Sequence, residues 1–198
     1  MTKLSIDTTG IRLHRNFFTR DVLEVAPDLL GKILVRQFED DTISRWIITE
    51  TEAYNGEEDK ACHASKGRTA RTEVMYWEGG YIYVYFIYGM YWLLNIVTGE
   101  KDQPQAVLIR GLNAINGPGR IGKQLNLDQS FYEEDLNTSK RLWLEEPTQN
   151  TYAYTSSARI GIDYAPDEWR LKPWRFSLKL HQTNDKKSNN FNQKKFLK

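Results

Sequence analysis

The sequence predicts an α+β fold: one domain in which a curved, mainly antiparallel sheet is flanked by helices and carries a protruding hairpin. Several segments alternate between apolar and polar residues with the period of a strand, most clearly from Tyr81 to Asn95. Helical segments lie among them without a regular strand-helix-strand rhythm, which disfavours a doubly wound parallel sheet. The 198 residues, 40% hydrophobic and 27% charged, match the size and composition of one globular domain.

The chain divides into a lead-in over residues 1–15, a folded domain over 16–181 and a tail over 182–198. The tail is rich in Asn, Lys and Gln and poor in apolar residues, so it is expected to be a disordered basic segment. The first helical signals run from 19 to 30. Thr19 can cap a turn that ends near Val25, Pro27 suits the first position of a second turn, and Gly31 can end it.

Strands are expected over 32–38 and 44–54, separated by the acidic turn 39–41, and a long polar loop follows over 55–72. The aromatic run then predicts a hairpin whose turn is Tyr88-Gly89-Met90, because glycine allows the positive φ that tight turns need. Further along, 105–111 is expected to be a strand and 120–126 a helix. We also expect a helix over 135–144 and strands over 158–164 and 175–179.

Charge and cysteine content limit the possible functions. The net charge of +1 gives no global argument for a nucleic-acid partner, so any such argument depends on local charge. Cys62 is the only cysteine, which excludes an intramolecular disulfide, a cysteine-held iron-sulfur cluster and a multi-cysteine zinc site. The N-terminus lacks the apolar region of a signal peptide, and no apolar window suits a membrane span, so a cytoplasmic location is expected.

Two carboxylates stand close together on the predicted strand 44–54. Strand alternation places Glu50 and Glu52 on one face with Trp46, Ile48 and Tyr54. A carboxylate among apolar rings is costly to bury unless it is paired, so these acids either reach solvent or hold arginines. Alternatively, one of them activates a water molecule beside a reacting carbon. The pattern alone leaves both interpretations open.

His63 lies in the loop that follows. A lone loop histidine is more often a structural hydrogen-bonding group than a catalyst. It is also one of four candidate metal ligands, with Glu50, Glu52 and Asp59, although no recognised ligand spacing supports a metal site.

Two polar residues interrupt apolar strands. Arg110 shares a strand face with Ala106 and Leu108, and an arginine in that position usually has a carboxylate partner, for which Glu52 or Glu50 is the simplest candidate. Asn95 lies between two aliphatic residues. Its amide either satisfies backbone groups of the sheet or accepts and rejects exocyclic groups of a base.

Local features suit contact with a nucleic-acid backbone. The turn Asn116-Gly117-Pro118-Gly119, with Arg120 and Lys123 beyond it, resembles a phosphate seat at the start of a helix. Arg68 and Arg71 add positive charge to the loop after the second strand, although a solvated loop explains them equally well. A large ring such as Tyr88 at an exposed turn has little core to fill.

In order along the chain, these segments resemble the alkyladenine (3-methyladenine) DNA glycosylase family, mammalian members included. The resemblance is carried by Leu29-Leu30-Gly31-Lys32-Ile33-Leu34-Val35, Glu50-Thr51-Glu52-Ala53-Tyr54, His63, Tyr83-Val84-Tyr85-Phe86-Ile87-Tyr88-Gly89-Met90-Tyr91, Asn95, Arg110 and Asn116-Gly117-Pro118-Gly119. It extends from about Phe17 to Phe176. It implies a fold like the C-terminal domain of formyltransferases, and neither an organic cofactor nor a catalytic metal.

The resemblance also implies roles for individual residues. Glu52 matches the acid that activates water, and Arg110 matches the arginine that helps to hold that water. The base pocket is implied to contain Tyr54, His63, Tyr85, Asn95 and Leu108, with Asn95 disfavouring the 2-amino group of normal guanine. Tyr88 matches the side chain that fills the gap left in the duplex. The DNA backbone is expected at Arg68, Arg71, Gly117, Gly119, Arg120 and Lys123.

The implied activity is that of a monofunctional DNA glycosylase without lyase activity. It would flip alkylated or deaminated purines of the 3-methyladenine, 7-methylguanine or hypoxanthine type out of duplex DNA and leave an abasic site. A monomer acting on the nucleoid of a bacterial-type cytoplasm is expected. Two alternatives remain at this stage: a non-catalytic nucleic-acid-binding module that uses the same hairpin, and a metal-dependent hydrolase.

Overall fold

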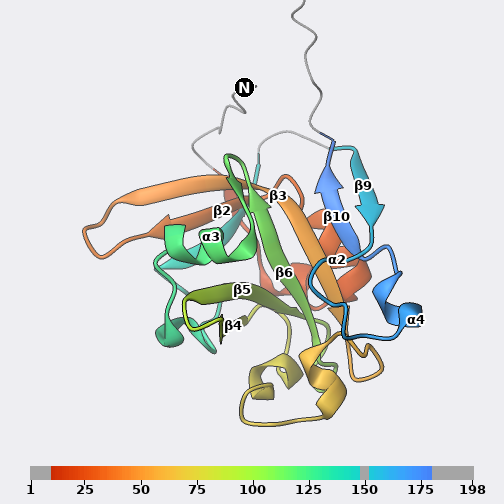
Figure 1. The fold of residues 1–198 in the computed structure, drawn as a ribbon. Coiled ribbons are helices and arrows are strands. Elements are labelled where there is room, and N and C mark those ends of the chain that lie inside the picture. The colour runs from red at the N-terminus through yellow and green to blue at the C-terminus, as the bar shows by residue number, and fades with distance from the viewer. Residues whose placement is uncertain (1–9, 148–151, 180–198) are drawn as a thin grey trace, which may run out of the picture.

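The computed structural model describes residues 10–147 and 152–179, in which short helices surround a large sheet (Figure 1). The strands are β1 (Ile11–Arg12), β2 (Ile33–Gln37), β3 (Ile43–Asn55), β4 (Ile82–Ile87), β5 (Tyr91–Thr98), β6 (Gln105–Leu112), β7 (Ile115–Asn116), β8 (Leu142–Glu146), β9 (Tyr154–Ser157) and β10 (Arg175–Leu178). The α-helices are α1 (Arg15–Phe18), α2 (Val22–Asp28), α3 (Pro118–Gln124) and α4 (Asp167–Arg170). The described residues also form three 3₁₀ helices, η1 (His63–Lys66), η2 (Glu73–Tyr76) and η3 (Gln129–Phe131).

The main path through the sheet runs β1-β8-β2-β3-β6-β5-β4, and every pairing between the described strands is antiparallel. β3 is long enough to serve two parts of the sheet. Its first half pairs with β2, and its second half pairs with β6 and β10. The predicted antiparallel α+β fold is therefore confirmed.

A change of register in β3 sets the direction of its acidic side chains. Pairing with β6 is irregular between Ile48 and Thr51, so the strict alternation of side chains fails there. Ile48 belongs to the main core, and the Thr51 hydroxyl donates to Ala26 O of α2 at 2.8 Å. Glu50 lines a cavity on the opposite face. The prediction that Ile48 shares a face with Glu50 was therefore wrong, because the irregularity shifts the alternation by one residue.

The main core lies between the sheet and helices α2 and α3. α3 approaches β5 so closely that a Cβ atom built on Gly122 would lie 1.9 Å from Trp92 O, which explains the glycine at that position. A second apolar cluster, on the other side of the sheet, joins the loop after β3 to β4, β5 and β6. It includes Cys62, Met75 and Tyr83 and forms the floor beneath the cavity described below.

The hairpin β4–β5 forms as predicted, with Tyr88, Gly89 and Met90 between its strands. Tyr88 and Gly89 have φ angles of 54° and 64°, the left-handed conformation typical of the tightest hairpin turns. Ile82 and Val84 face the core, whereas Tyr83 and Tyr85 face the cavity. Tyr88 is 80% exposed, so its ring stands at the tip without a core to fill.

Three predicted elements differ from the structure. The helix after residue 19 begins at Val22, because the Asp21 carboxylate accepts the Leu23 N–H at 2.8 Å and caps it, and Pro27 lies inside it. Residues 135–141 form turns and 142–146 form β8, since Leu142 and Leu144 alternate inward beside β2. Residues 158–164 are irregular, and the strand before them is β9.

The strands predicted over 32–38, 44–54, 105–111 and 175–179 correspond to β2, β3, β6 and β10, and the helix predicted over 120–126 corresponds to α3, which starts earlier. The predicted tail over 182–198 lies outside the described residues, as does most of the lead-in. No helix in the described ranges is long and apolar enough to cross a membrane.

Candidate functional site

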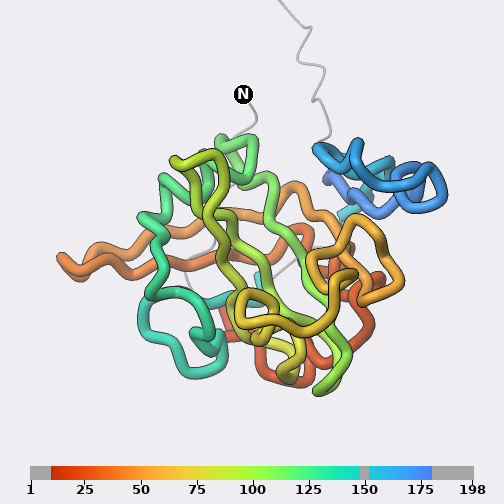
Figure 2. The backbone as a smooth tube through the Cα atoms, turned by 60° about the horizontal axis from the view of Figure 1, so that its bottom comes forward, coloured from red at the N-terminus to blue at the C-terminus, as the bar shows by residue number. Residues whose placement is uncertain are grey.

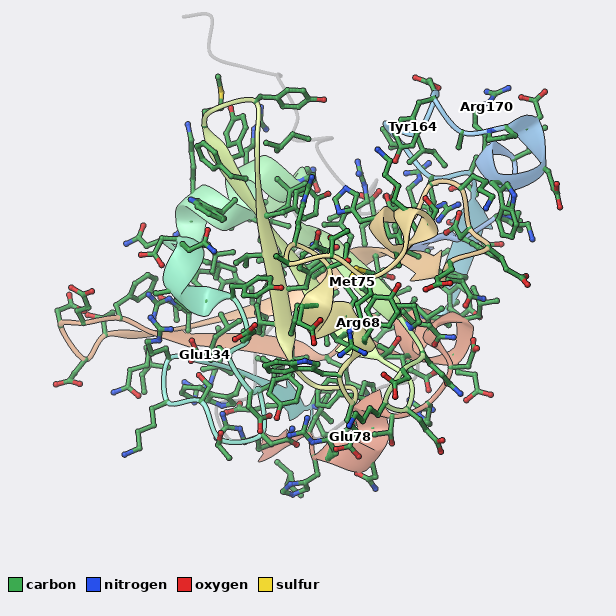
Figure 3. All side chains as sticks on the ribbon, turned by 90° about the horizontal axis from the view of Figure 1, so that it is seen from below. Arg68, Met75, Glu78, Glu134, Tyr164 and Arg170 are labelled. Carbon is green, nitrogen blue, oxygen red and sulfur yellow. The ribbon has the colours of Figure 1, made fainter. Side chains whose placement is uncertain are left out.

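A cavity of about 780 Å³ opens on one face of the sheet. β3, β4, β5 and β6 form its back, the loop after β3 forms one side, and the start of α3 lies at its edge. The other wall comes from residues 152–179, here called the C-terminal segment. In Figures 2 and 3 this segment and the tip of the β4–β5 hairpin stand on the same side of the molecule.

The cavity gathers most of the residues predicted from the sequence. Those that line it are Tyr54, His63, Arg71, Tyr85, Tyr88, Asn95, Leu108, Arg110, Gly117, Gly119 and Arg120. Glu52 lies immediately behind the lining, whereas Arg68 and Lys123 lie outside it. The set comes from four strands, the loop after β3, the hairpin turn and the start of α3, so the fold brings together residues that are distant in the sequence.

Glu52 is fully buried and is held by three groups. Its Oε1 accepts the Ile160 N–H at 2.7 Å and lies 3.3 Å from Arg110 Nε, and its Oε2 accepts the Tyr54 hydroxyl at 2.9 Å. Burial raises the pKa of this carboxyl above the usual glutamate value, although Arg110, Ile160 and Tyr54 all oppose the rise. A carboxylate in this environment is fixed in direction and is a stronger proton acceptor than one in water.

Glu50 occupies a more open position. Its Oε1 lies 3.3 Å from Arg110 Nε and 3.0 Å from Arg175 Nη1, and its side chain is 20% exposed at the cavity wall. The sequence suggested Glu52 or Glu50 as the partner of Arg110, and in the structure both carboxylates contact it. The geometry suits Glu50 for holding the two guanidinium groups in place.

Three aromatic rings of the cavity lining, those of His63, Tyr83 and Tyr85, contact one another. The His63 ring meets the Tyr85 ring edge-on with centroids 4.6 Å apart, and His63 Nδ1 is hydrogen-bonded to the Tyr83 hydroxyl at 2.7 Å. Burial, followed by the charges of Arg71 and Lys66, lowers the pKa of His63 to about 4. His63 is consequently a neutral ring at physiological pH, suited to stacking or to a single hydrogen bond with a ligand.

Asn95 and Leu108 lie opposite each other on neighbouring strands at the back of the cavity. The Asn95 amide nitrogen donates to Tyr83 O at 3.1 Å and to Leu93 O at 3.5 Å. Both bonds bind the side chain to the sheet, which is the structural role considered from the sequence. They also fix an amide at the cavity wall, where it limits the space for a ligand.

The start of α3 borders the cavity through Gly117, Gly119 and Arg120. Lys123, one turn later, lies over the Tyr91 ring at 4.7 Å, outside the cavity lining. Arg68 is tied to Glu73 at 2.6 Å and to Asp102 at 3.0 Å, so two carboxylates neutralise its charge. The cations predicted to contact the DNA backbone therefore differ in how far their charge is neutralised, and that of Arg68 is already paired.

The C-terminal segment contributes residues that the sequence analysis missed. Arg159 is fully buried and forms a two-pronged ion pair with Asp59, with nitrogen-oxygen distances of 2.5 and 2.9 Å. It also donates to Ala53 O at 2.9 Å, and the Tyr164 hydroxyl donates to Ala61 O at 2.9 Å. These bonds hold the segment against the loop that carries His63, and Figure 3 shows Tyr164 on this segment.

This anchoring places Ile160, the neighbour of Arg159, where its backbone N–H reaches Glu52. Arg175 is placed separately, by the pairing of β10 with β3, and its side chain reaches Glu50. The signal in the sequence was weak, because an arginine in an irregular stretch predicts nothing by itself. Arg159 and its partner Asp59 are 100 residues apart in the sequence, so only the folded structure shows that they pair.

The alternative metal site is not assembled. Within the described ranges, no three His, Cys, Asp or Glu side chains are arranged to hold a metal ion. Of the four candidate ligands, Glu50 and Glu52 contact Arg110, and Asp59 is bonded to Arg159. These carboxylates are thus occupied by arginines.

Comparison with known proteins identifies the family to which this chain belongs. Residues 16–115 and 112–182 match the family model described as methylpurine-DNA glycosylase (MPG). The chain belongs to this family. Membership supports a DNA glycosylase function in base-excision repair, and hence a DNA substrate.

Three relatives show how far the sequence similarity extends along this member of the methylpurine-DNA glycosylase family. Proteins named "Putative 3-methyladenine DNA glycosylase" from Desulfitobacterium hafniense, Borrelia garinii and Methanocella arvoryzae are each 42% identical to it. The alignments cover 86%, 84% and 83% of this chain and 97%, 96% and 90% of the respective relatives. The similarity thus extends over nearly the whole length of these relatives.

Proposed function

We propose that this protein hydrolyses the N-glycosidic bond of alkylated or deaminated purines in double-stranded DNA. The bases would be of the 3-methyladenine, 7-methylguanine or hypoxanthine type, and the product an abasic site. The single observation that carries the proposal is the buried Glu52, held by Arg110 behind a cavity that is lined with aromatic rings and large enough to admit a purine base. The cavity volume of about 780 Å³ lies within the range of roughly 300–1000 Å³ typical of small-molecule sites.

The reaction requires a water molecule at the sugar carbon that bears the base. Glu52 would take a proton from this water, and Arg110 would hold the water in line. The negative charge of Glu52 would also stabilise the positive charge that develops on the sugar as the bond breaks. Because the Glu52 oxygens already accept from Tyr54 and Ile160, the attacking water must replace or share one of these bonds.

A base inside a duplex is out of reach of this carboxylate, so it must first be flipped out. The rings of Tyr54, His63 and Tyr85 would enclose the flipped base, with Leu108 behind it. Tyr88 would occupy the vacated position in the stack, which its exposure at the hairpin tip allows. The amide of Asn95 would leave too little room for the 2-amino group of guanine.

The DNA backbone would lie across the mouth of the cavity. Gly117, Gly119 and Arg120 at the start of α3 are the strongest candidates for phosphate contact, because they already border the opening. Lys123, Arg68 and Arg71 complete the proposed backbone surface. Arg68 can contribute only if DNA competes with its two carboxylate partners. The protein would act as a monomer on chromosomal DNA in the cytoplasm.

The test is release of free base from a duplex that contains one hypoxanthine or one 3-methyladenine. Wild-type protein should release the base and leave an abasic strand that breaks only after alkaline treatment, as expected of a monofunctional enzyme. Breakage without alkali would show lyase activity. Salt-dependent binding without release would instead favour a non-catalytic binding module.

A further inference from the structure

Arg71 has an unusual position for a cation expected to contact DNA phosphates. Its guanidinium carbon lies 5.2 Å from the centre of the Tyr85 ring, and its side chain lines the cavity. Among the residues that the structure describes, Arg71 forms no ion pair. Arg68 in the same loop is the opposite case, since Glu73 and Asp102 neutralise it. A partly solvent-exposed guanidinium without a carboxylate partner among the described residues therefore stands against the ring proposed to stack on the base.

The other charges of the cavity do not cancel it. The lining contains the arginines 71, 110, 120 and 175 but a single carboxylate, Glu50, with Glu52 behind it. Both carboxylates contact Arg110, and Glu50 also contacts Arg175. These two carboxylates are therefore paired with two of the four arginines, Arg110 and Arg175. The aromatic end of the cavity, near Tyr85, thus lies in the field of Arg71 without a nearby counter-charge.

The pKa of His63 agrees with this placement of Arg71. After burial, the charge of Arg71 is the largest cause of the lowered pKa of His63, whose ring meets the Tyr85 ring edge-on. A cation that disfavours a proton on His63 disfavours other positive charges placed beside that ring. The π-face of Tyr85 is also partly satisfied by a protein cation, which reduces its attraction for a cationic ligand.

We infer that Arg71 is a specificity-determining residue that favours uncharged lesion bases over cationic methylated purines. The inference depends on the proposed function and refines its substrate class. A purine nucleoside methylated at N3 or N7 carries a positive charge, whereas hypoxanthine is neutral. The planar guanidinium can stack on a neutral purine ring, but it repels a cationic one. The more labile bond of a cationic purine compensates for weaker binding, so both classes remain substrates.

The experiment compares two duplexes of identical sequence, one with hypoxanthine and one with 7-methylguanine. The quantity measured is kcat/KM for base release on each, expressed as the ratio of the two. Arg71→Gln should raise the ratio of 7-methylguanine to hypoxanthine about tenfold, which corresponds to the loss of about 1.4 kcal/mol of repulsion between like charges. Arg71→Lys keeps the charge and should keep the ratio within about threefold of wild type.

Lys60→Gln is the matched control. Lys60 is an exposed cation of the same loop that neither lines the cavity nor contributes to the lowered pKa of His63, so its removal should leave the ratio unchanged. If Arg71→Gln lowers both rates by the same factor, Arg71 acts only as the phosphate contact proposed above and the inference is wrong. If wild-type protein releases neither base, the proposed function fails instead. The two failures are therefore distinguishable.

Discussion

The two walls of the cavity are built in different ways. The β4–β5 hairpin is one continuous stretch whose strands pair residue by residue, and its alternation directs Tyr83 and Tyr85 into the cavity. The C-terminal segment has little regular structure around residues 158–164 and is held by the Arg159–Asp59 ion pair. One wall is specified by local periodicity, and the other by a bond between residues far apart in the chain.

The difference corresponds to two tasks. The hairpin wall supplies Tyr85, one of the three rings that would contact the base, and the Tyr88 wedge, and ring contacts of this kind tolerate small shifts. The C-terminal wall supplies the Ile160 N–H that contacts Glu52, where a shift of one ångström would break a hydrogen bond. A buried, two-pronged ion pair is a more exact anchor than a row of apolar contacts. The comparison predicts that damage to the two walls has different consequences.

Breaking the anchor of the C-terminal wall should have the largest effect. Arg159→Met leaves Asp59 buried without its partner, which costs about 3–5 kcal/mol in the free energy of unfolding. Base release should fall further than the loss of folded protein explains, because Ile160 no longer holds Glu52. Urea unfolding and base release, measured at a temperature where the variant is folded, check both effects.

Arg170→Met is the control for this prediction, since the Arg170–Asp167 pair lies in the same segment but is exposed. It should change neither stability nor activity measurably. If Arg159→Met were as active per folded molecule as wild type, the ion pair would be a stabilising contact without influence on Glu52.

Removing the wedge of the hairpin wall should leave stability intact. Tyr88→Ala deletes an 80% exposed ring, so the unfolding midpoint should not change. Release of hypoxanthine from duplex DNA should fall by about 10- to 100-fold, because nothing then replaces the flipped base in the stack. Release from single-stranded DNA should be unaffected. Equal losses on both substrates would show that Tyr88 is part of the base pocket instead.

The smallest expected effect is that of Tyr54, whose hydroxyl contacts Glu52. The Tyr54 hydroxyl donates to Glu52 and thereby favours the ionised carboxylate. Activity requires ionised Glu52, so it should decline as the pH falls through the raised pKa of this group. Tyr54→Phe removes one stabilising bond, raises that pKa further and should move the acidic limb of kcat to higher pH by up to about one unit. A shift to lower pH would contradict the assignment.

The sequence predicted the hairpin wall much better than the C-terminal wall, for a physical reason. The alternating run from Tyr81 to Asn95 predicted the hairpin and its turn. Alternation also places Leu108 and Arg110 on one face of β6, and both line the cavity as expected. The same rule failed for Ile48, because an irregular pairing in β3 carries no signal in the residues themselves. The position of Arg159 depends on a partner that no local pattern reveals.

The roles of His63 and Asn95 came from the resemblance to a family, not from the physics of single residues. Either residue alone is equally consistent with a structural role, and both do make structural hydrogen bonds. The error over residues 135–144 has a similar origin. Leu142 and Leu144 are compatible with a helix until β2 provides an edge for them to pair with.

The most direct test compares the two carboxylates. Glu50→Gln and Glu52→Gln are matched variants, each of which removes one negative charge beside Arg110 and keeps the shape of the side chain. Our account predicts that Glu52→Gln slows base release from hypoxanthine duplexes by about 100- to 10,000-fold while abasic DNA still binds. Glu50→Gln, which only loosens the hold on Arg110 and Arg175, should cost no more than about tenfold. A greater loss in Glu50→Gln than in Glu52→Gln would contradict the claim that the buried carboxylate activates the water.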